Sequence, residues 1–206
     1  MNWKEFLVLK KNKIELIISF LILAVVLTIL ANFLKFVEAR AGVILPDPIL
    51  ALFNPIDLTW LIFILIYLSL VLAIATLLKN PKQLLFAIQL YTTMVVLRII
   101  AMYLLPLDPP AAMIILNDPF VEFFGTGQTL TKDLFFSGHT ATLFILFLVS
   151  QKPILKIIFL ISTIMVAIAV LLQHVHYTID VFAALFFTYA CYKIILKIRP
   201  EIVNGE

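Results

Sequence analysis

Charged residues are scarce in this sequence. Asp, Glu, Lys and Arg make up 13% of its 206 residues and hydrophobic residues 64%, whereas an average soluble domain has about 25% and about 45–50%. The apolar residues lie in blocks of about twenty, which is the length that crosses the hydrocarbon core of a bilayer, and not at amphipathic spacing. This composition excludes a soluble globular protein, and we predict an integral membrane protein.

Cysteine is nearly absent as well. The single one, Cys191, lies in an apolar run, so it cannot form an internal disulfide and we interpret it as a small buried hydrophobic residue. The sequence has three histidines and no convincing metal-ligand cluster, so we expect no metal and no other cofactor. The net charge of +3 says little about nucleic acid, and no nucleic-acid partner is expected.

Six apolar segments predict an all-α protein with six transmembrane helices in one transmembrane domain, residues 1–206. The helices are expected at residues 14–37, 57–78, 83–105, 135–150, 154–173 and 177–197. The first segment is longer than a signal-peptide core and lacks a cleavage site, so it stays in the protein. The fourth is the shortest, and Phe135 and Phe136 at its start suit the membrane interface.

Lysine and arginine predict the orientation, because they concentrate on the cytoplasmic side of membrane proteins. If the N-terminus is cytoplasmic, eleven of the fifteen basic residues lie on the cytoplasmic side. They are Lys4, Lys10, Lys11, Lys13, Lys79, Lys82, Lys152, Lys156, Lys193, Lys197 and Arg199. Both termini are then cytoplasmic. The longest connection, residues 106–134, lies outside, and its apolar stretches at 111–116 and 120–124 predict a piece in the membrane interface.

The residues suited to acid, base or nucleophilic chemistry gather on that outer face. His176 and Asp180 are four residues apart, so on one helix face the carboxylate can accept the Nδ1 proton and leave Nε2 free for attack on phosphorus. His139, on a neighbouring helix, can protonate the departing oxygen. These three residues form our predicted catalytic triad.

A phosphate site is predicted beside the triad. Ser137 is the expected N-cap of the fourth helix, and Gly138 lets the backbone approach phosphate oxygens at the positive helix end. Arg98 lies deep in the third helix, where an unpaired charge is unfavourable, and its guanidinium suits two phosphate oxygens. Lys132 is a second candidate cation.

Structural roles are open alternatives for several of these side chains. The two histidines of the triad can be polar caps at the interface, and Arg98 can snorkel or pair with Asp47 or Asp108. His174 is interpreted as structural or water-facing. Aromatic residues at helix ends are commonly interface anchors, and Tyr103, Tyr177 and Trp60 fit that description.

Several segments resemble motifs of the sphingomyelin synthase branch of the type 2 phosphatidic acid phosphatase superfamily. Residues 133–140, DLFFSGHT, are similar to the first histidine motif from its Asp onward, and residues 176–184, HYTIDVFAA, to the second over its whole length. Residues 98–103, RIIAMY, followed by Leu107 and a proline pair, resemble the arginine segment of the third helix. Residues 45–47, LPD, partly resemble a proline-rich motif. The resemblance spans about residues 45–190.

The resemblance implies six helices, a luminal or extracellular active site, and head-group transfer through a phosphohistidine-type intermediate. It makes His176 the nucleophile, Asp180 its orienting partner and His139 the acid. Four further residues are head-group or accessory candidates: Asp133, Tyr177, Asp47 and Tyr103. The sequence departs from the family's motifs at three places. Thr131-Lys132 stand where the family usually has Cys-Gly, Arg98 is single where some members have two arginines, and Val175 replaces an acidic residue often found before the nucleophile. The lysine and arginine motif of the wider phosphatases is absent, which favours the synthase branch.

We therefore expect an enzyme that takes the head group of a phospholipid and passes it to ceramide, diacylglycerol or water. Asp108, Asp118 or Glu122 can supply a counter-charge for a cationic head group. A phosphatase acting on phosphatidic acid or a polyprenyl pyrophosphate is the alternative, and a non-catalytic lipid transporter or scaffold is a third. The compact chain suggests a bacterial cytoplasmic membrane protein with an extracytoplasmic site, and its oligomeric state is left open.

Overall fold

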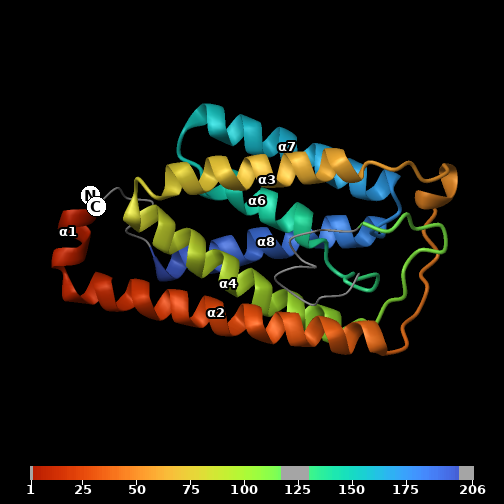
Figure 1. The fold of residues 1–206 in the computed structure, drawn as a ribbon, viewed down its shortest axis with the longest axis horizontal. Helices are drawn as coiled ribbons and strands as arrows, with labels where there is room; N and C mark the ends of the chain where they lie inside the picture. The colour runs from red at the N-terminus through yellow and green to blue at the C-terminus, as the bar shows by residue number, and fades with distance from the viewer. Residues whose placement is uncertain (1, 117–129, 200–206) are drawn as a thin grey trace.

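The computed structural model describes residues 2–116 and 130–199. In this part of the chain the regular structure is helical, apart from one isolated parallel bridge between Val43 and Leu107. Figure 1 shows an elongated bundle. Its elements are α1 (Trp3–Val8), α2 (Lys10–Ala39), the 3-10 helix η1 (Leu50–Leu52), α3 (Thr59–Leu77), α4 (Pro81–Leu104), α6 (Gly138–Val149), α7 (Pro153–Leu172) and α8 (Thr178–Ile198). The prediction of an all-α protein is confirmed.

Five helices, α2, α3, α4, α7 and α8, are long and apolar enough to cross a membrane, which supports an integral membrane protein. The sixth predicted span is α6, which is apolar but has only 12 residues. At a rise of about 1.5 Å per residue it reaches about 18 Å, against about 30 Å of hydrocarbon. Six crossings and cytoplasmic termini stay predictions.

The helix boundaries follow from local sequence signals. Asn80 accepts a hydrogen bond from the N–H of Gln83 and precedes Pro81, so α4 begins with a capping side chain and a proline in its first turn. Pro153 likewise stands in the first turn of α7, whose N-cap residue Lys152 makes no capping side-chain hydrogen bond. The observed helices match the expected ranges closely, although α2 begins earlier, at Lys10, and the fourth helix begins at Gly138.

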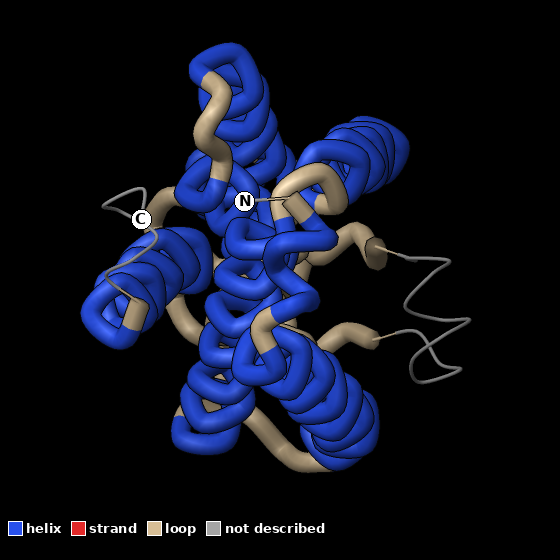
Figure 2. The backbone as a smooth tube through the Cα atoms, turned by 90° about the vertical axis from the view of Figure 1, so that its left-hand side faces the viewer, coloured by secondary structure: helices blue, strands red, loops and turns tan. Residues whose placement is uncertain are grey.

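The 12-residue helix α6 is the central one. It packs against α3, α4, α7 and α8, and the view along the bundle shows the helices gathered around a common centre (Figure 2). Phe136, just before α6, is fully buried and stacks on Phe187 with ring centroids 5.6 Å apart. Phe136 is therefore a core residue, because the chain has already entered the core when α6 begins; its depth in the membrane stays a prediction.

The loops at the histidine end of the bundle are held together by backbone hydrogen bonds. The N–H of Ile56 donates to Leu172 at 2.8 Å and the N–H of Ile114 donates to Gln173 at 3.1 Å. Both bonds fasten a connecting loop to the end of α7. The expected interfacial stretch at 120–124 and the candidate acids Asp118 and Glu122 lie outside the described residues.

Candidate active site

His176 lies in the turn between α7 and α8. Its Nδ1 is 3.2 Å from Oδ2 of Asp180, and the two side chains are 2% and 0% exposed. The pairing was expected on one helix face, but His176 precedes α8, which starts at Thr178 after the N-cap residue Tyr177. The two side chains meet because the Asp180 carboxylate folds back over the helix start, where Oδ2 also accepts the Tyr177 N–H at 3.1 Å.

Asp180 also ties the two histidine segments together. Its backbone carbonyl accepts a hydrogen bond from the N–H of Ser137 at 3.2 Å, which fixes the start of α6 against the first turn of α8. Its second carboxylate oxygen, Oδ1, is buried and has no hydrogen-bond partner among the described residues. An unsatisfied buried acceptor costs about 1–3 kcal/mol, and a catalytic role is one reason why native proteins retain such groups.

Arg98 is buried in α4 at the same depth as the start of α6. Its Nε donates to the carbonyl of Phe136 at 2.8 Å, and its Nη2 is 2.5 Å from Oδ1 of Asp133. The ion-pair partner is thus Asp133, and not Asp47 or Asp108. The remaining terminal nitrogen, Nη1, makes no hydrogen bond to the described part of the chain. Arg98 is held rigidly and keeps one donor available.

The start of α6 lies directly against that guanidinium. Ser137 is the N-cap, as predicted, and its hydroxyl accepts the Thr140 N–H at 3.4 Å. A Cβ on Gly138 would be 3.0 Å from Cζ and 3.3 Å from Nη1 of Arg98, so only glycine leaves the guanidinium its place. The N–H of Gly138 has no partner within the described residues. This N–H and Nη1 can together hold an anionic oxygen at the positive end of a helix.

His139 is the second residue of α6 and is half-buried. The hydrogen bond from Ser137 to Asp180 places the beginning of α6 next to the beginning of α8. His139 therefore belongs to the same end of the bundle as His176. This neighbourhood suits the predicted acid, whose role stays a prediction.

Lys132 is engaged elsewhere. Its ammonium is 2.8 Å from Oδ1 of Asp108 and donates to the carbonyl of Arg40 at 2.8 Å. The hydrogen bond from Lys132, with some opposition from desolvation, lowers the pKa of Asp108 below its ordinary value. Lys132 holds two connecting loops together, and within the described residues it contacts neither Arg98 nor the histidines through a hydrogen bond or ion pair.

Asp47 stabilises the start of α8. Its Oδ2 accepts the Thr178 N–H at 2.7 Å, and its Oδ1 accepts the Thr178 hydroxyl at 3.1 Å and the Ile49 N–H at 3.0 Å. Burial acts to raise the pKa of Asp47, but these hydrogen bonds outweigh it and the pKa is lowered. Asp47 thus supports the turn that carries His176 instead of presenting a free carboxylate to a head group.

The two candidate tyrosines differ in their environments. Tyr177 is 1% exposed, and its hydroxyl donates to the carbonyl of Asp108 at 2.9 Å and accepts the Leu45 N–H at 3.2 Å. Burial raises the pKa of Tyr177, so the phenol keeps the proton that it donates. Tyr103 is 62% exposed near the end of α4, in keeping with an interface anchor.

His174 is buried in the same turn as His176, and its Nε2 has no hydrogen-bond partner among the described residues; a structural role stays a prediction. His174 is 5% exposed, has φ 54° and lies edge-on to Phe53 with ring centroids 5.3 Å apart. Histidine is one of the few residues that adopt this left-handed conformation readily. The preceding Gln173 is fully buried. Its side-chain oxygen accepts the Leu58 N–H at 3.0 Å, and its side-chain nitrogen donates to the Thr59 hydroxyl at 2.9 Å. The turn before His176 is therefore rigid.

The sequence interpretation missed Glu38 and the role of Gln173. The Glu38 carboxylate, at the end of α2, accepts the N–H groups of Thr131 and Lys132, each at 3.0 Å, and so anchors the segment that leads into Asp133 and α6. An acidic residue at the end of a long apolar span is the signal that could have identified it.

Comparison with protein-family models matches residues 132–197 to PAP2 superfamily C-terminal. The matched segment contains Asp133, the α6 start, His176 and Asp180. It supports the type 2 phosphatidic acid phosphatase superfamily, whose members generally act on lipid phosphate esters. No match to a curated protein was found. Among the residues that the structure describes, no three His, Cys, Asp or Glu side chains are grouped to hold a metal ion.

Proposed function

We propose that the protein transfers the phosphate-bearing head group of a phospholipid to an acceptor through a phosphohistidine on His176. The observation that carries the proposal is the juxtaposition of two units. One is the buried His176–Asp180 pair, with 3.2 Å between Nδ1 and Oδ2. The other is the Arg98–Gly138 anion site, which a bond from Ser137 to Asp180 holds beside that pair.

In the first step, Nε2 of His176 attacks phosphorus and the bond from phosphorus to the diacylglycerol oxygen breaks. His139 gives its proton to that oxygen, and the head group remains on His176. Asp180 stabilises the imidazole as it becomes positive. In the second step the acceptor hydroxyl, from ceramide, diacylglycerol or water, loses its proton to His139. Its oxygen then attacks phosphorus and the phosphorus–nitrogen bond breaks.

The charge of the site favours a phosphodiester over a phosphomonoester. Asp133 is paired with Arg98 and Asp108 with Lys132, so each of these cations already has a carboxylate partner. A phosphodiester carries one negative charge, whereas a phosphomonoester carries close to two at neutral pH. Within the described residues the site offers one guanidinium nitrogen of Arg98 and the N–H of Gly138, which suits the single charge of a phosphodiester. The phosphatase reaction on phosphatidic acid is the second candidate.

The test compares purified protein with its His176→Ala variant on phospholipids labelled in the phosphocholine or phosphoethanolamine head group. Each is supplied with and without ceramide, and phosphatidic acid is a parallel substrate. Label in a ceramide product supports the synthase reaction, and free phosphocholine or phosphoethanolamine supports hydrolysis. Phosphate release from phosphatidic acid alone would favour the phosphatase. Turnover by His176→Ala equal to that of the unmodified protein would exclude the phosphohistidine.

His174→Asn is the matched control. His174 lies in the same turn but has no carboxylate partner, and asparagine also adopts positive φ. We expect this variant to keep its activity while Asp180→Asn loses it. No turnover of any lipid by the unmodified protein would favour a transporter or scaffold. Loss of activity with a chelator and its recovery with zinc would contradict the metal-free scheme.

A further inference from the structure

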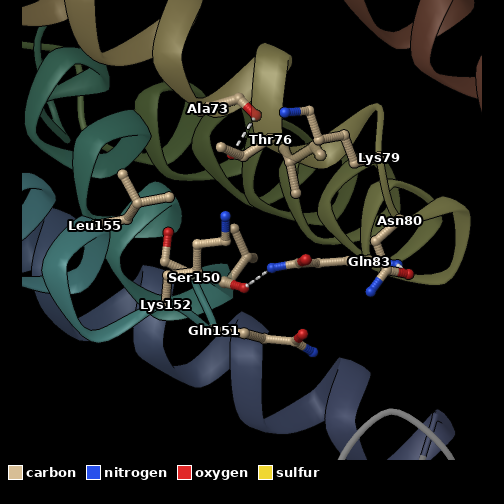
Figure 3. Close-up of a pocket in the computed structure, with 11 residues that line it drawn as sticks. Ala73, Thr76, Lys79, Asn80, Gln83, Ser150, Gln151, Lys152 and Leu155 are labelled. Carbon is tan, nitrogen blue, oxygen red and sulfur yellow. Dashed lines mark hydrogen bonds between the residues drawn. The ribbon is translucent and has the colours of Figure 1, made fainter.

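A cavity of about 160 Å³, lined by both apolar and polar side chains, lies at the end of the bundle opposite the histidines. It opens between the turn joining α3 to α4 and the turn joining α6 to α7 (Figure 3). Lys79 and Asn80 line one side, Ser150 and Lys152 line the other, and Gln83 reaches across between them. None of the lining residues is acidic, and the cavity is large enough for several water molecules.

The cavity has polar groups that the protein leaves unused. Lys79 and Lys152 are exposed and have no ion-pair partner among the described residues. Ser150 is 8% exposed, and its hydroxyl makes no hydrogen bond within the described chain. The hydroxyl oxygen itself is not fully buried, so it is accessible to a ligand atom in the cavity.

Two other polar side chains of the cavity, Gln83 and Asn80, are hydrogen-bonded within the protein. Gln83 donates from its amide to the carbonyl of Val149 at 2.5 Å, and Asn80 accepts the Gln83 N–H at 3.3 Å. These bonds fasten the start of α4 to the end of α6. The first turns of α4 and α7 both begin at this cavity, and their N-terminal ends add positive potential to that of the lysines.

We propose that this cavity binds the phosphate group of an anionic phospholipid from the membrane leaflet at this end of the bundle. Two lysines and a hydroxyl without a partner in the described part of the chain suit a phosphate, whereas a zwitterionic head group would bring its own ammonium against the lysines. The apolar side chains of Leu78 and Ile154, next to the cavity, are 52% and 62% exposed. They give acyl chains a surface to lie on, which a free phosphate does not need. Basic pockets between helices are a known form of lipid head-group site.

The test titrates the full-length protein in detergent with fluorescent phosphatidylglycerol and, in parallel, with fluorescent phosphatidylcholine and with inorganic phosphate. The double variant Lys79→Gln/Lys152→Gln should bind phosphatidylglycerol about 30-fold more weakly. Each lysine near an anionic head group contributes about fivefold to the binding constant. Ser150→Ala should weaken binding about tenfold, as the loss of one hydrogen bond to a charged group. Thermal unfolding confirms that each variant is folded.

The matched control, Lys13→Gln/Lys197→Gln, removes the same charge outside the cavity, and we expect it to bind phosphatidylglycerol like the unmodified protein. The proposal would be overturned if the two lysine double variants weakened phosphatidylglycerol binding equally. It would also be overturned if phosphatidylcholine bound as tightly as phosphatidylglycerol. Lysine-dependent binding of inorganic phosphate with the same affinity would make the free anion the ligand and overturn the lipid assignment. His176→Ala should bind like the unmodified protein, so this result is independent of the proposed catalysis.

Discussion

Replacing Gly138 with alanine should separate activity from stability. The new Cβ would be 3.0 Å from Cζ of Arg98, whereas carbon atoms in favourable contact are about 3.5–4.0 Å apart. The guanidinium would have to retreat by about 0.5 Å or more. It cannot do so freely, because its bonds to Phe136 and Asp133 hold it at 2.8 and 2.5 Å.

The expected loss corresponds to one hydrogen bond between the guanidinium and a phosphate oxygen. Such a charge-assisted bond contributes about 1.5–3 kcal/mol, so kcat/KM should fall about 10- to 150-fold. Stability should hardly change, because alanine is the better helix former by up to about 1 kcal/mol. That gain offsets the local crowding, and we expect Tm to stay within about 3 °C of the original value.

The assay is a double-mutant cycle with Arg98→Lys. Head-group release from labelled phospholipid and thermal unfolding are measured for the unmodified protein, Gly138→Ala, Arg98→Lys and the double variant. Lysine lacks the planar fork of arginine, so the added Cβ should have a smaller effect in that background and the two losses should not add. Full activity in Gly138→Ala, or strictly additive losses, would refute the role of the guanidinium contact.

Three other variants test the surroundings of the site. Asp180→Asn should lower head-group transfer at least about 100-fold with little change in Tm, since the amide cannot balance the charge on His176; unchanged transfer would contradict this. Gly42→Ala would bring a Cβ within 2.4 Å of the Leu107 carbonyl carbon and should lower stability by about 2 kcal/mol or more, seen as a lower Tm. Asp47→Asn should lower Tm at pH 7. Because the folded-state pKa of Asp47 is lowered, this difference should persist above about pH 4 and disappear as the pH falls through that lowered value; a difference that grows toward acid would reverse the assignment.

Local patterns predicted much of the fold and part of the site. The long apolar runs predicted the five long helices because a bilayer-length run has few alternatives to a helix. Ser137 was identified as a cap because its position before an apolar helix determines its local hydrogen bond. The His176–Asp180 pair was also found, although the pair is formed by the turn and the capping bond and not by one helix face.

Pairings between distant segments were harder to predict from the sequence. Arg98 was predicted to bind phosphate, but its pairing with Asp133 instead of Asp47 or Asp108 depends on where α6 begins within the bundle. Lys132 was expected at the phosphate, and its bond to Asp108 comes from the way two connecting loops meet. Charge alone does not distinguish among several acids on one membrane face.

Composition and short-range patterns were enough to predict the membrane setting, the helical class and the residues that can do chemistry at one end of the bundle. Each of these follows from composition or from neighbours a few residues apart. Tertiary packing places the 12-residue helix α6 at the centre of the bundle and brings its start against Arg98. It also decided that Asp47 supports α8, and it formed the lysine-lined cavity at the other end. These features depend on the packing of segments distant in sequence, which local hydropathy and spacing do not encode.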